Sequence, residues 1–214
     1  MQILSLESID STQKYLKELI AQGRVTPPYA VVASIQTSGV GSRDNVWQGE
    51  ENNLFLSFAI PLSDLPQDLK LESASIYFSH IMKETLEEFG SKVWLKWPND
   101  FYINDKKIGG MITNLVGECI VCGIGLNLQN APDGFDKLDI SIKREKLLES
   151  YFSNIEKKSL WKQVFSKYKL EFYKNQNFYT HEKNLIISLG EAALQGDGSR
   201  SEERRVGKEC RSRW

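Results

Sequence analysis

The sequence is poor in cysteine and histidine, with three cysteines and two histidines among 214 residues. An odd, sparse set of cysteines argues against the disulfide framework of small secreted domains. Cys119 and Cys122 have CxxC spacing, but neither a second pair nor a nearby histidine accompanies them. Because an odd separation on a strand points side chains to opposite faces, we interpret both as core thiols rather than metal ligands. His80, on an apolar helix, is interpreted as structural.

A long apolar run and an excess of positive charge are also missing. No stretch of about 18 apolar residues occurs, and the start MQILSLESID lacks the basic-then-apolar order of a signal peptide. The formal net charge is -1, so neither nucleic acid nor a membrane is expected as a partner. These features predict a cytoplasmic protein, and we expect it to be a monomer or a homodimer.

Arginine is scarce until the last fifteen residues, which hold five of the eight arginines. The preceding 199 residues use lysine almost exclusively as their cation. This abrupt change, in a segment without apolar periodicity, predicts that residues 199–214 are a vector-derived tail. A native basic tail is the alternative.

Strands and helices are predicted from the period of the apolar residues. The strands cluster between helices instead of alternating with them, which indicates an α+β fold with a mixed, mostly antiparallel sheet and flanking helices. Strands are expected at 29–36, 53–60, 92–97, 108–116 and 119–128. Helices are expected between Ser11 and Gly23 and at 72–89, 143–152 and 160–172, the last with an aromatic stripe that we assign to the core.

The stretch KWPNDFYINDKKIGG, from Lys96 to Gly110, is the most informative part of the chain. Asn104-Asp105 is a turn pair, so the stretch is predicted to form a β-hairpin in which Lys96 and Lys107 face the same small volume. Gly109-Gly110 lets a ligand approach the backbone. Two cations, a carboxylate and a diglycine together suit chemistry on an anion.

The run that enters this stretch is predicted to be a strand with two unlike faces. Pro98 ends it, because proline has no N–H to donate to a neighbouring strand. The buried face is expected to hold Val93, Leu95 and Trp97, and the polar face Lys92, Trp94 and Lys96.

With three other blocks, this stretch resembles the biotin protein ligase family. The blocks are Ser11-Thr12 at a helix start, QTSGVGSR at 36–43, the KWPND and KKIGG pair, and GIGLN at 123–127, in the family's order. The resemblance implies a biotin/lipoate ligase-like catalytic domain over residues 1–183. It also implies that residues 184–198 begin a truncated SH3-like β domain, and that the chain is a short form without the family's N-terminal DNA-binding domain.

The resemblance further implies a ligase that uses ATP, Mg²⁺ and biotin. Biotin's carboxylate attacks the α-phosphate of ATP to give biotinyl-5'-adenylate, and a lysine of a biotin carboxyl carrier protein, such as an acetyl-CoA carboxylase subunit, then takes the biotinyl group. Lys107 matches the catalytic lysine between the carboxylate and the phosphate. A lipoate-protein ligase and a non-catalytic biotin or nucleotide sensor are the alternatives.

Further site residues follow from matching the family's motifs. Gln13 departs from the family's asparagine, and the loop from Thr37 to Val46 has a single arginine where relatives have several. We expect this loop to be mobile without ligand and to become ordered by the adenylate. The residues matched to biotin binding are Ser11, Thr12, Gln36, Gly39, Val40, Gly110, Met111 and Ile112. Those matched to ATP or adenylate binding are Gly41, Ser42, Arg43, Trp47, Lys96, Asn99, Asp100 and Asn127, with Asp100 also the metal ligand.

Overall fold

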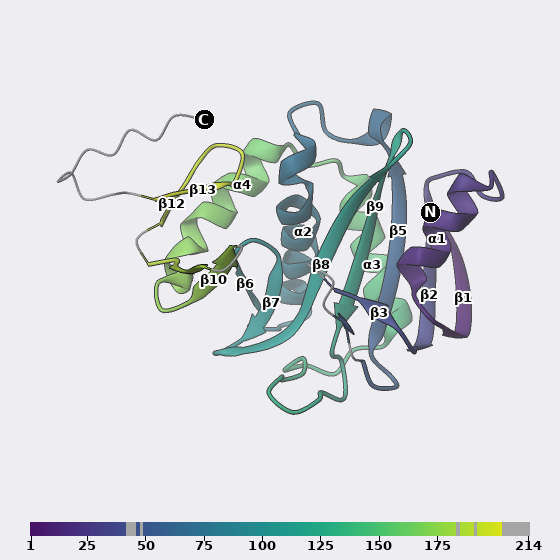
Figure 1. Cartoon of the computed structure of the whole chain (residues 1–214), viewed down its shortest axis with the longest axis horizontal. Coiled ribbons are helices and arrows are strands. Elements are labelled where there is room, and N and C mark those ends of the chain that lie inside the picture. The colour runs from purple at the N-terminus through teal and green to yellow at the C-terminus, as the bar shows by residue number, and fades with distance from the viewer. Residues whose placement is uncertain (42–45, 48, 183–184, 191, 203–214) are drawn as a thin grey trace.

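A seven-stranded sheet forms the centre of the molecule (Figure 1). The computed structural model describes residues 1–41, 46–47, 49–182, 185–190 and 192–202. The outermost pair of strands on one side is parallel, and every other neighbouring pair is antiparallel, so the predicted mixed, mostly antiparallel sheet is confirmed. The order across the sheet is β1 (Gln2–Ile9), β2 (Tyr29–Gln36), β5 (Leu54–Pro61), β9 (Cys119–Leu126), β8 (Lys106–Val116), β7 (Asp100–Ile103) and β6 (Trp94–Lys96).

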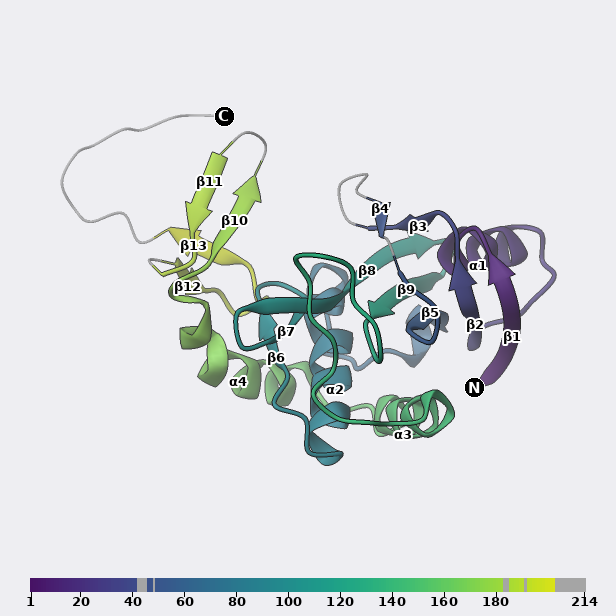
Figure 2. The same cartoon turned by 90° about the horizontal axis from the view of Figure 1, so that it is seen from below.

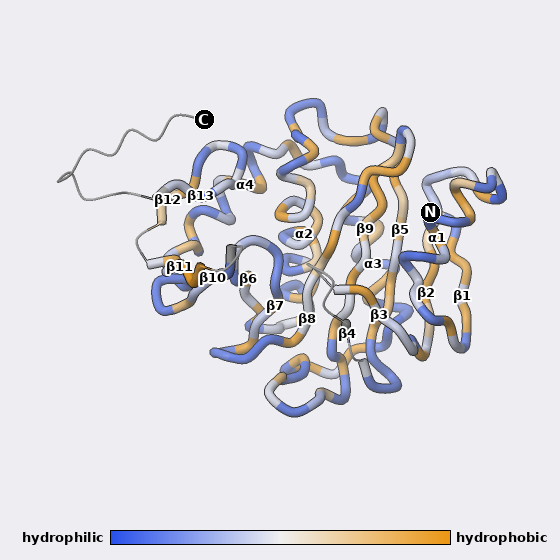
Figure 3. Tube along the Cα trace, viewed as in Figure 1, coloured by the Kyte–Doolittle hydropathy of each residue, from blue (hydrophilic) through white to orange (hydrophobic). Residues whose placement is uncertain are grey.

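Helices cover both faces of this sheet (Figure 2). On one face, α1 (Thr12–Ala21) buries Leu16 and Leu19 against Val31 of β2 and Val121 of β9. On the other face, α2 (Ala74–Glu88), α3 (Arg144–Glu156) and α4 (Trp161–Glu171) build the larger core. The central strands β5 and β9 are almost wholly apolar because both of their faces are covered (Figure 3).

The start of α1 is fixed locally by its cap. Ser11 is the N-cap residue, and its Oγ accepts a hydrogen bond from the backbone N–H of Lys14 at 3.4 Å. Gly23 follows the helix with a φ of +66°, a left-handed conformation that favours glycine. The predicted limits of this helix are therefore confirmed, and Thr12, its first residue, lies beside the end of β2 and the middle of β5.

Smaller elements lie outside the main sheet. The loop after β2 forms a short pair of strands, and the chain beyond α4 forms a 3-10 helix followed by two hairpins, which lie beside α4 (Figure 1). These elements are β3 (Gly39–Val40) with β4 (Val46–Trp47), the 3-10 helices η2 (Leu62–Asp64), η3 (Leu71–Ser73) and η4 (Phe172–Asn175), β10 (Tyr179–Glu182) with β11 (Leu185–Ser188), and β12 (Ala192–Leu194) with β13 (Arg200–Glu202).

These hairpins bear on the predicted division of the chain. The predicted boundary at 183/184 falls between the paired strands β10 and β11. Three residues of the predicted tail, Arg200–Glu202, form β13 and pair with β12. Residues 203–214 lie outside the described part of the chain. The division into domains stays a prediction.

One strand and one strand face differ from the sequence-based predictions. β1 was not predicted as a strand, whereas β7 and the start of β8 form the predicted hairpin with its turn at Asn104-Asp105. The predicted polar face of β6 is wrong for Trp94, which is buried because Phe178 packs on it with ring centroids 5.1 Å apart. This cover comes from a segment far along the chain, so the local alternation of side chains could not show it.

The two cysteines of the CxxC pair lie on opposite faces of β9, as their spacing predicts. Cys122 is fully buried, and burial raises the pKa of its thiol well above its usual value. Cys119 is half-buried because it opens the strand directly after a turn, so the core interpretation is wrong for this residue.

Among the described residues, no helix is long and apolar enough to cross a membrane.

Candidate active site

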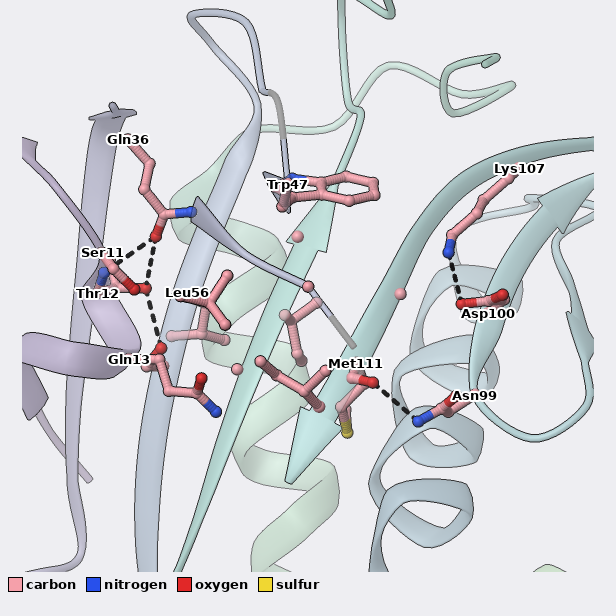
Figure 4. A pocket seen from close by; sticks show the side chains of 18 residues that line it. Ser11, Thr12, Gln13, Gln36, Trp47, Leu56, Asn99, Asp100, Lys107 and Met111 are labelled. Atoms are coloured by element: carbon pink, nitrogen blue, oxygen red, sulfur yellow. Dashed lines mark hydrogen bonds and ion pairs between the residues drawn. The ribbon is translucent and has the colours of Figure 1, made fainter. Parts of the chain in front are cut away.

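An open pocket lies over the centre of the sheet, between the start of α1 and the β7–β8 hairpin (Figure 4). The empty space within it is about 530 Å³, part of which is continuous with solvent. Neutral polar groups lie at one end, a lysine and a carboxylate at the other, and Trp47 between them. The lining residues are Ser11, Thr12, Gln13, Gln36, Val40, Gly41, Trp47, Leu56, Ser57, Asn99, Asp100, Lys107, Gly110, Met111, Ile112, Gly123, Ile124 and Gly125.

The neutral end is organised around Thr12. Its backbone N–H and its Oγ1 both donate to Oε1 of Gln36, at 3.0 and 3.1 Å. The same hydroxyl lies 2.9 Å from Oγ of Ser57, the one hydroxyl within the apolar strand β5. Ser57 was not predicted as a site residue, although a lone hydroxyl in a buried strand is a signal that sequence reading can use. Three elements, α1, β2 and β5, thus fix one set of donors and acceptors.

Gln13 closes this end of the pocket. Its side chain is buried and donates from Nε2 to Oδ1 of Asn114 at 3.1 Å. The glutamine that departs from the family pattern is therefore a pocket wall anchored to β8. An added Cβ at Gly123 would lie 3.3 Å from the same Nε2, so the floor beneath Gln13 has little spare room.

The charged end depends on a β-bulge. β7 and β8 pair in register from Asp100 opposite Gly110 to Phe101 opposite Gly109, and then shift so that Lys107 lies opposite Tyr102. Residues directly opposite each other share a face, so the extra residue in β8 puts Lys107 and Asp100 on the same side. Their side chains form an ion pair, with Lys107 Nζ 2.7 Å from Asp100 Oδ1, and are 29% and 27% exposed.

Gly110 makes room for this pair. A Cβ at this position would lie 2.9 Å from Oδ1 of Asp100 and 3.6 Å from Nζ of Lys107. The first distance is shorter than real Cβ contacts, so a side chain here would displace the carboxylate. The diglycine was predicted to let a ligand approach the backbone. At Gly110 the space left by the missing side chain is next to the Lys107–Asp100 ion pair.

Lys96 flanks the same carboxylate from the other side. It pairs with Asp100 across the β6–β7 ladder, and its Nζ lies 5.8 Å from the ring centroid of Tyr102 and 6.0 Å from that of Phe178. Burial lowers the pKa of Lys96, the carboxylate of Asp100 opposes this effect, and the charge of Lys107 adds to it. The charges of Lys96 and Lys107 thus interact, but of the two lysines Lys107 alone lines the pocket.

Trp47 covers the middle of the pocket. Its indole packs against Gly125, where an added Cβ would meet Nε1 at 2.4 Å, and its ring centroid lies 5.9 Å from Nζ of Lys107. The indole N–H is buried and has no hydrogen-bond partner among the described residues. A ligand in the pocket would therefore contact both the ring and the ammonium.

Asn99 is tied to β8 by two hydrogen bonds. Its Nδ2 donates to the carbonyl of Met111 at 2.8 Å, and its own carbonyl accepts from the Met111 N–H at 3.2 Å. The side chain therefore keeps the predicted strand edge, Gly110 to Ile112, beside Asp100. Both segments line the pocket.

The remaining predicted site residues lie elsewhere. Gly39 pairs with Trp47 beside the pocket without lining it. Asn127 is fully buried and bonds within the protein: its Oδ1 accepts from Asn53 at 3.4 Å and its Nδ2 donates to the Asp136 carbonyl at 3.1 Å. Its described contacts order a strand end, and its ligand contact stays a prediction. Ser42 and Arg43 lie outside the described residues.

Comparisons with known proteins agree with this geometry. The model of the biotin/lipoate A/B protein ligase family matches residues 5–127. A solved biotin acetyl coenzyme A carboxylase synthetase from Helicobacter pylori, with bound biotinylated ATP, is 37% identical with a TM-score of 0.91, over 95% of this chain and 97% of that one. A biotin protein ligase from Aquifex aeolicus, in complex with biotin and ATP, is 23% identical with a TM-score of 0.75, over 93% and 90% of the two chains, which shows the fold alone.

Among curated proteins, the bifunctional ligase/repressor BirA of Bacillus subtilis is 34% identical over 137 residues. This match covers 59% of the chain and 40% of the repressor, so the chain spans less than half the length of this relative. The family model, in contrast, covers more than half of the chain and includes every residue that lines the pocket. The chain belongs to the biotin/lipoate A/B protein ligase family.

Proposed function

We propose that this protein is an ATP-dependent ligase that activates biotin as biotinyl-5'-adenylate and transfers it to a lysine of a biotin carboxyl carrier protein. The pocket supports this proposal, because it joins fixed neutral donors and acceptors at one end to the Lys107–Asp100 pair at the other. The similar Helicobacter pylori protein was solved with biotinylated ATP bound. An acid with a neutral ring system and a nucleotide phosphate together match such a pocket.

Biotin is assigned to the neutral end. Its ureido ring needs a few fixed polar partners inside an apolar slot, and the Thr12, Gln36 and Ser57 group supplies them on three different elements. Because these groups already hold one another, little ordering is required when the ligand arrives. The other residues assigned to biotin are Ser11, Gly39, Val40, Gly110, Met111 and Ile112.

Lys107 is assigned to the meeting point of the two anions. In the first step, a carboxylate oxygen of biotin bonds to the α-phosphorus of ATP, the bond from that phosphorus to the bridging oxygen breaks, and pyrophosphate leaves. Both reactants are negative, so a fixed cation lowers the energy of their approach. The ion pair with Asp100 holds the ammonium of Lys107 at the pocket wall until the substrates replace Asp100 as its partner.

The nucleotide is assigned to the charged end and to the loop above it. Lys96, Asn99 and Asp100 come from the end of β6, the turn after it and the start of β7. Gly41, Ser42, Arg43 and Trp47 come from the chain between β2 and β5, and Asn127 directly follows β9. The carboxylate of Asp100 is part-exposed at the pocket wall, and Mg²⁺ accepts one carboxylate together with phosphate oxygens and waters. When bound there, Mg²⁺ would offset phosphate charge.

In the second step, the amine of the acceptor lysine bonds to the carbonyl carbon of the adenylate. The carbon–oxygen bond of the mixed anhydride breaks, AMP leaves, and the amine gives up a proton to solvent. Trp47 lies over the middle of the pocket, where it would exclude water from the anhydride.

The setting of this reaction is proposed from composition and from the family. We place the enzyme in the cytoplasm, as a monomer or a homodimer without a nucleic-acid or membrane partner. Residues 1–183 are proposed as the catalytic domain, 184–198 as the start of a truncated β domain, and 199–214 as a vector-derived tail.

Pyrophosphate release from ATP tests the proposal directly. We expect release with biotin and none above background with lipoate or without an acid. Transfer is then followed as label from biotin on a purified carrier protein and on its variant that lacks the acceptor lysine. Pyrophosphate release with lipoate but not with biotin would identify a lipoate-protein ligase. If the protein binds biotin but releases no pyrophosphate with either acid, it is a sensor.

A further inference from the structure

The turn that carries the nucleotide-side residues is held from behind by a distant segment. This turn joins β6 to β7 and contains Trp97, Pro98 and Asn99, directly before Asp100. The backbone N–H of Trp97 donates to Oδ1 of Asn175 at 2.8 Å. The carbonyl of Pro98 accepts from the hydroxyl of Tyr168 at 3.1 Å. One contact comes from α4 and the other from η4.

Both side chains are buried and directed at backbone atoms. Tyr168 is 4% exposed and Asn175 is 1% exposed. Besides Trp97, Asn175 also bonds the carbonyl of Leu95 on β6, from Nδ2 at 3.4 Å. Burial of a polar side chain is unfavourable unless its partners are in place, so these contacts define one position of the turn relative to α4.

The opposite side of the turn is fixed to the pocket wall. Asn99 is bonded to Met111 of β8 through both its side chain and its carbonyl. The turn is therefore held between β8 in front and α4 with η4 behind. Burial, and then the charge of Asp100, raise the pKa of Tyr168, so the phenol stays a neutral donor to the Pro98 carbonyl.

Tyr168 and Asn175 lie outside the part of the chain that the family model matches, residues 5–127. Their hydrogen bonds reach β6 and the turn after it, whereas the Thr12, Gln36 and Ser57 group assigned to biotin is held by α1, β2 and β5. Removing them would let the turn shift while the neutral end keeps its own hydrogen bonds. A shift of about 1 Å in a reacting group is enough to slow a reaction by about 100-fold.

We propose that Tyr168 and Asn175 are positioning residues that set the Trp97–Asn99 turn, and with it Asp100, for the reaction with ATP. This inference rests on the proposed ligase function. The hydroxyl of Tyr168 and the amide of Asn175 touch the turn, whereas Asp100 and Lys107 would touch the substrates.

The experiment compares two tyrosines that differ in what they hold. Tyr151 is also fully buried, and its hydroxyl donates to the Phe78 carbonyl at the same 3.1 Å, but in the core between α2 and α3. Tyr168→Phe and Tyr151→Phe each remove one buried hydroxyl that donates to a backbone carbonyl. Pyrophosphate release against ATP concentration, biotin affinity by calorimetry, and Tm are measured for both variants, and Asn175→Ala is measured as a second probe of the turn.

We expect Tyr168→Phe and Asn175→Ala to lower kcat/KM for ATP by about tenfold or more, with biotin affinity within about twofold of wild type. Tyr151→Phe should keep kcat/KM for ATP even if its Tm falls as far. Equal kcat/KM for the two Phe variants, or a parallel loss of biotin affinity in Tyr168→Phe, would overturn the proposal. A wild-type protein that releases no pyrophosphate with biotin would instead overturn the proposed function, and the two failures are therefore distinct.

Discussion

At the scale of single residues, Gly110 shows how little space the charged end has. Its missing Cβ leaves the gap in which Asp100 meets Lys107. We expect Gly110→Ala to push the carboxylate away and to lower the rate of pyrophosphate release, because the added carbon would lie 2.9 Å from Oδ1. Gly196→Ala is the control, since a Cβ there meets no atom within 4 Å. Equal rates for both variants would show that the ion pair tolerates displacement.

Lys107 should matter for chemistry rather than for folding. Losing one charged contact to a developing anion costs about 3 to 4 kcal/mol, so Lys107→Ala should slow pyrophosphate release by about 10² to 10³. Its exposed hairpin neighbour gives a matched control in Lys106→Ala, and Tm should be near wild type for both. Lys107→Arg should not restore the rate, because a planar fork does not replace a compact ammonium. Near-normal release by Lys107→Ala would refute its catalytic assignment.

Substitution of Asp100 should weaken the binding of the two substrates to different extents. A neutral amide is a poor partner for Mg²⁺, so Asp100→Asn should weaken Mg²⁺-dependent ATP binding more than biotin binding. Calorimetry with each ligand measures the difference, and Asp105→Asn, in the exposed turn of the same hairpin, serves as the control. Equal losses for ATP and biotin would mean that the carboxylate acts by holding the hairpin.

At the scale of elements, charged side chains join α4 to α2. Lys167 Nζ lies 2.6 Å from Oε1 of Glu84, and the buried Lys83 pairs with Glu171 and with Glu87. For Lys83, these carboxylates outweigh burial and raise its pKa. Because α4 carries Tyr168, the ion pairs also fix the helix from which that hydroxyl reaches the active-site turn.

The ion pairs predict a pH dependence of folding stability. Neighbouring His80 and Lys167 lower the pKa of Glu84 from 4.5 to about 2. The folded state therefore binds fewer protons here than the unfolded state, so the stabilisation is complete above pH 4.5 and is lost as the pH falls towards 2. Urea unfolding from pH 6 to about pH 2 should show a steeper loss for wild type than for Glu84→Gln. The exposed Glu72→Gln should keep the wild-type slope, and equal slopes for all three would contradict the prediction.

Elements with strong local signals were predictable from sequence, and those defined by distant contacts were not. Tyr29–Gln36 was predicted to the residue, and α1, α2 and α4 within two residues, because their apolar period and end signals agree. β7 has four residues between two turns, too short to show a period. The face of Trp94 was misassigned because Phe178, which covers it, lies 84 positions later in the sequence.

The candidate site was predictable where motifs carry it. Thr12, Gln36, Asp100 and Lys107 were all named from sequence and line one pocket. Ser57 was missed because it belongs to no motif and sits within an apolar strand. Asn127 was assigned to nucleotide binding from its motif. Its side chain instead bonds to Asn53 and to the Asp136 carbonyl, which lie in other parts of the chain and could not be matched to it from sequence.

At the scale of the whole molecule, hydrogen bonds attach the C-terminal segment to the main body of the protein. Backbone carbonyls of the turn between β12 and β13 accept three hydrogen bonds from distant elements. Asp197 accepts from the Ser73 hydroxyl at 2.7 Å, and Gly196 and Gly198 accept from the indoles of Trp161 and Trp97, each at 2.9 Å.

Two truncations test how far this role extends. Removing residues 203–214, the part of the predicted tail 199–214 that follows β13, should leave Tm and pyrophosphate release unchanged. Removing residues 195–214 should lower both, because two indole N–H groups lose their acceptors. A loss from the shorter truncation would show that the last residues are native, and no loss from the longer one would show that the β12–β13 turn is dispensable.

The bulge in β8 also has a consequence for how the chain folds. If β7 and β8 paired without the bulge, their register would shift by one residue. Lys107 would then face the core on the side of Phe101, and Ile108 would face the pocket. Burying an unpaired ammonium costs several kcal/mol, and a solvent-facing Ile108 would forfeit its packing. The slipped pairing is thereby penalised on both faces at once. The lysine assigned to the reaction thus also disfavours mispairing of this hairpin during folding.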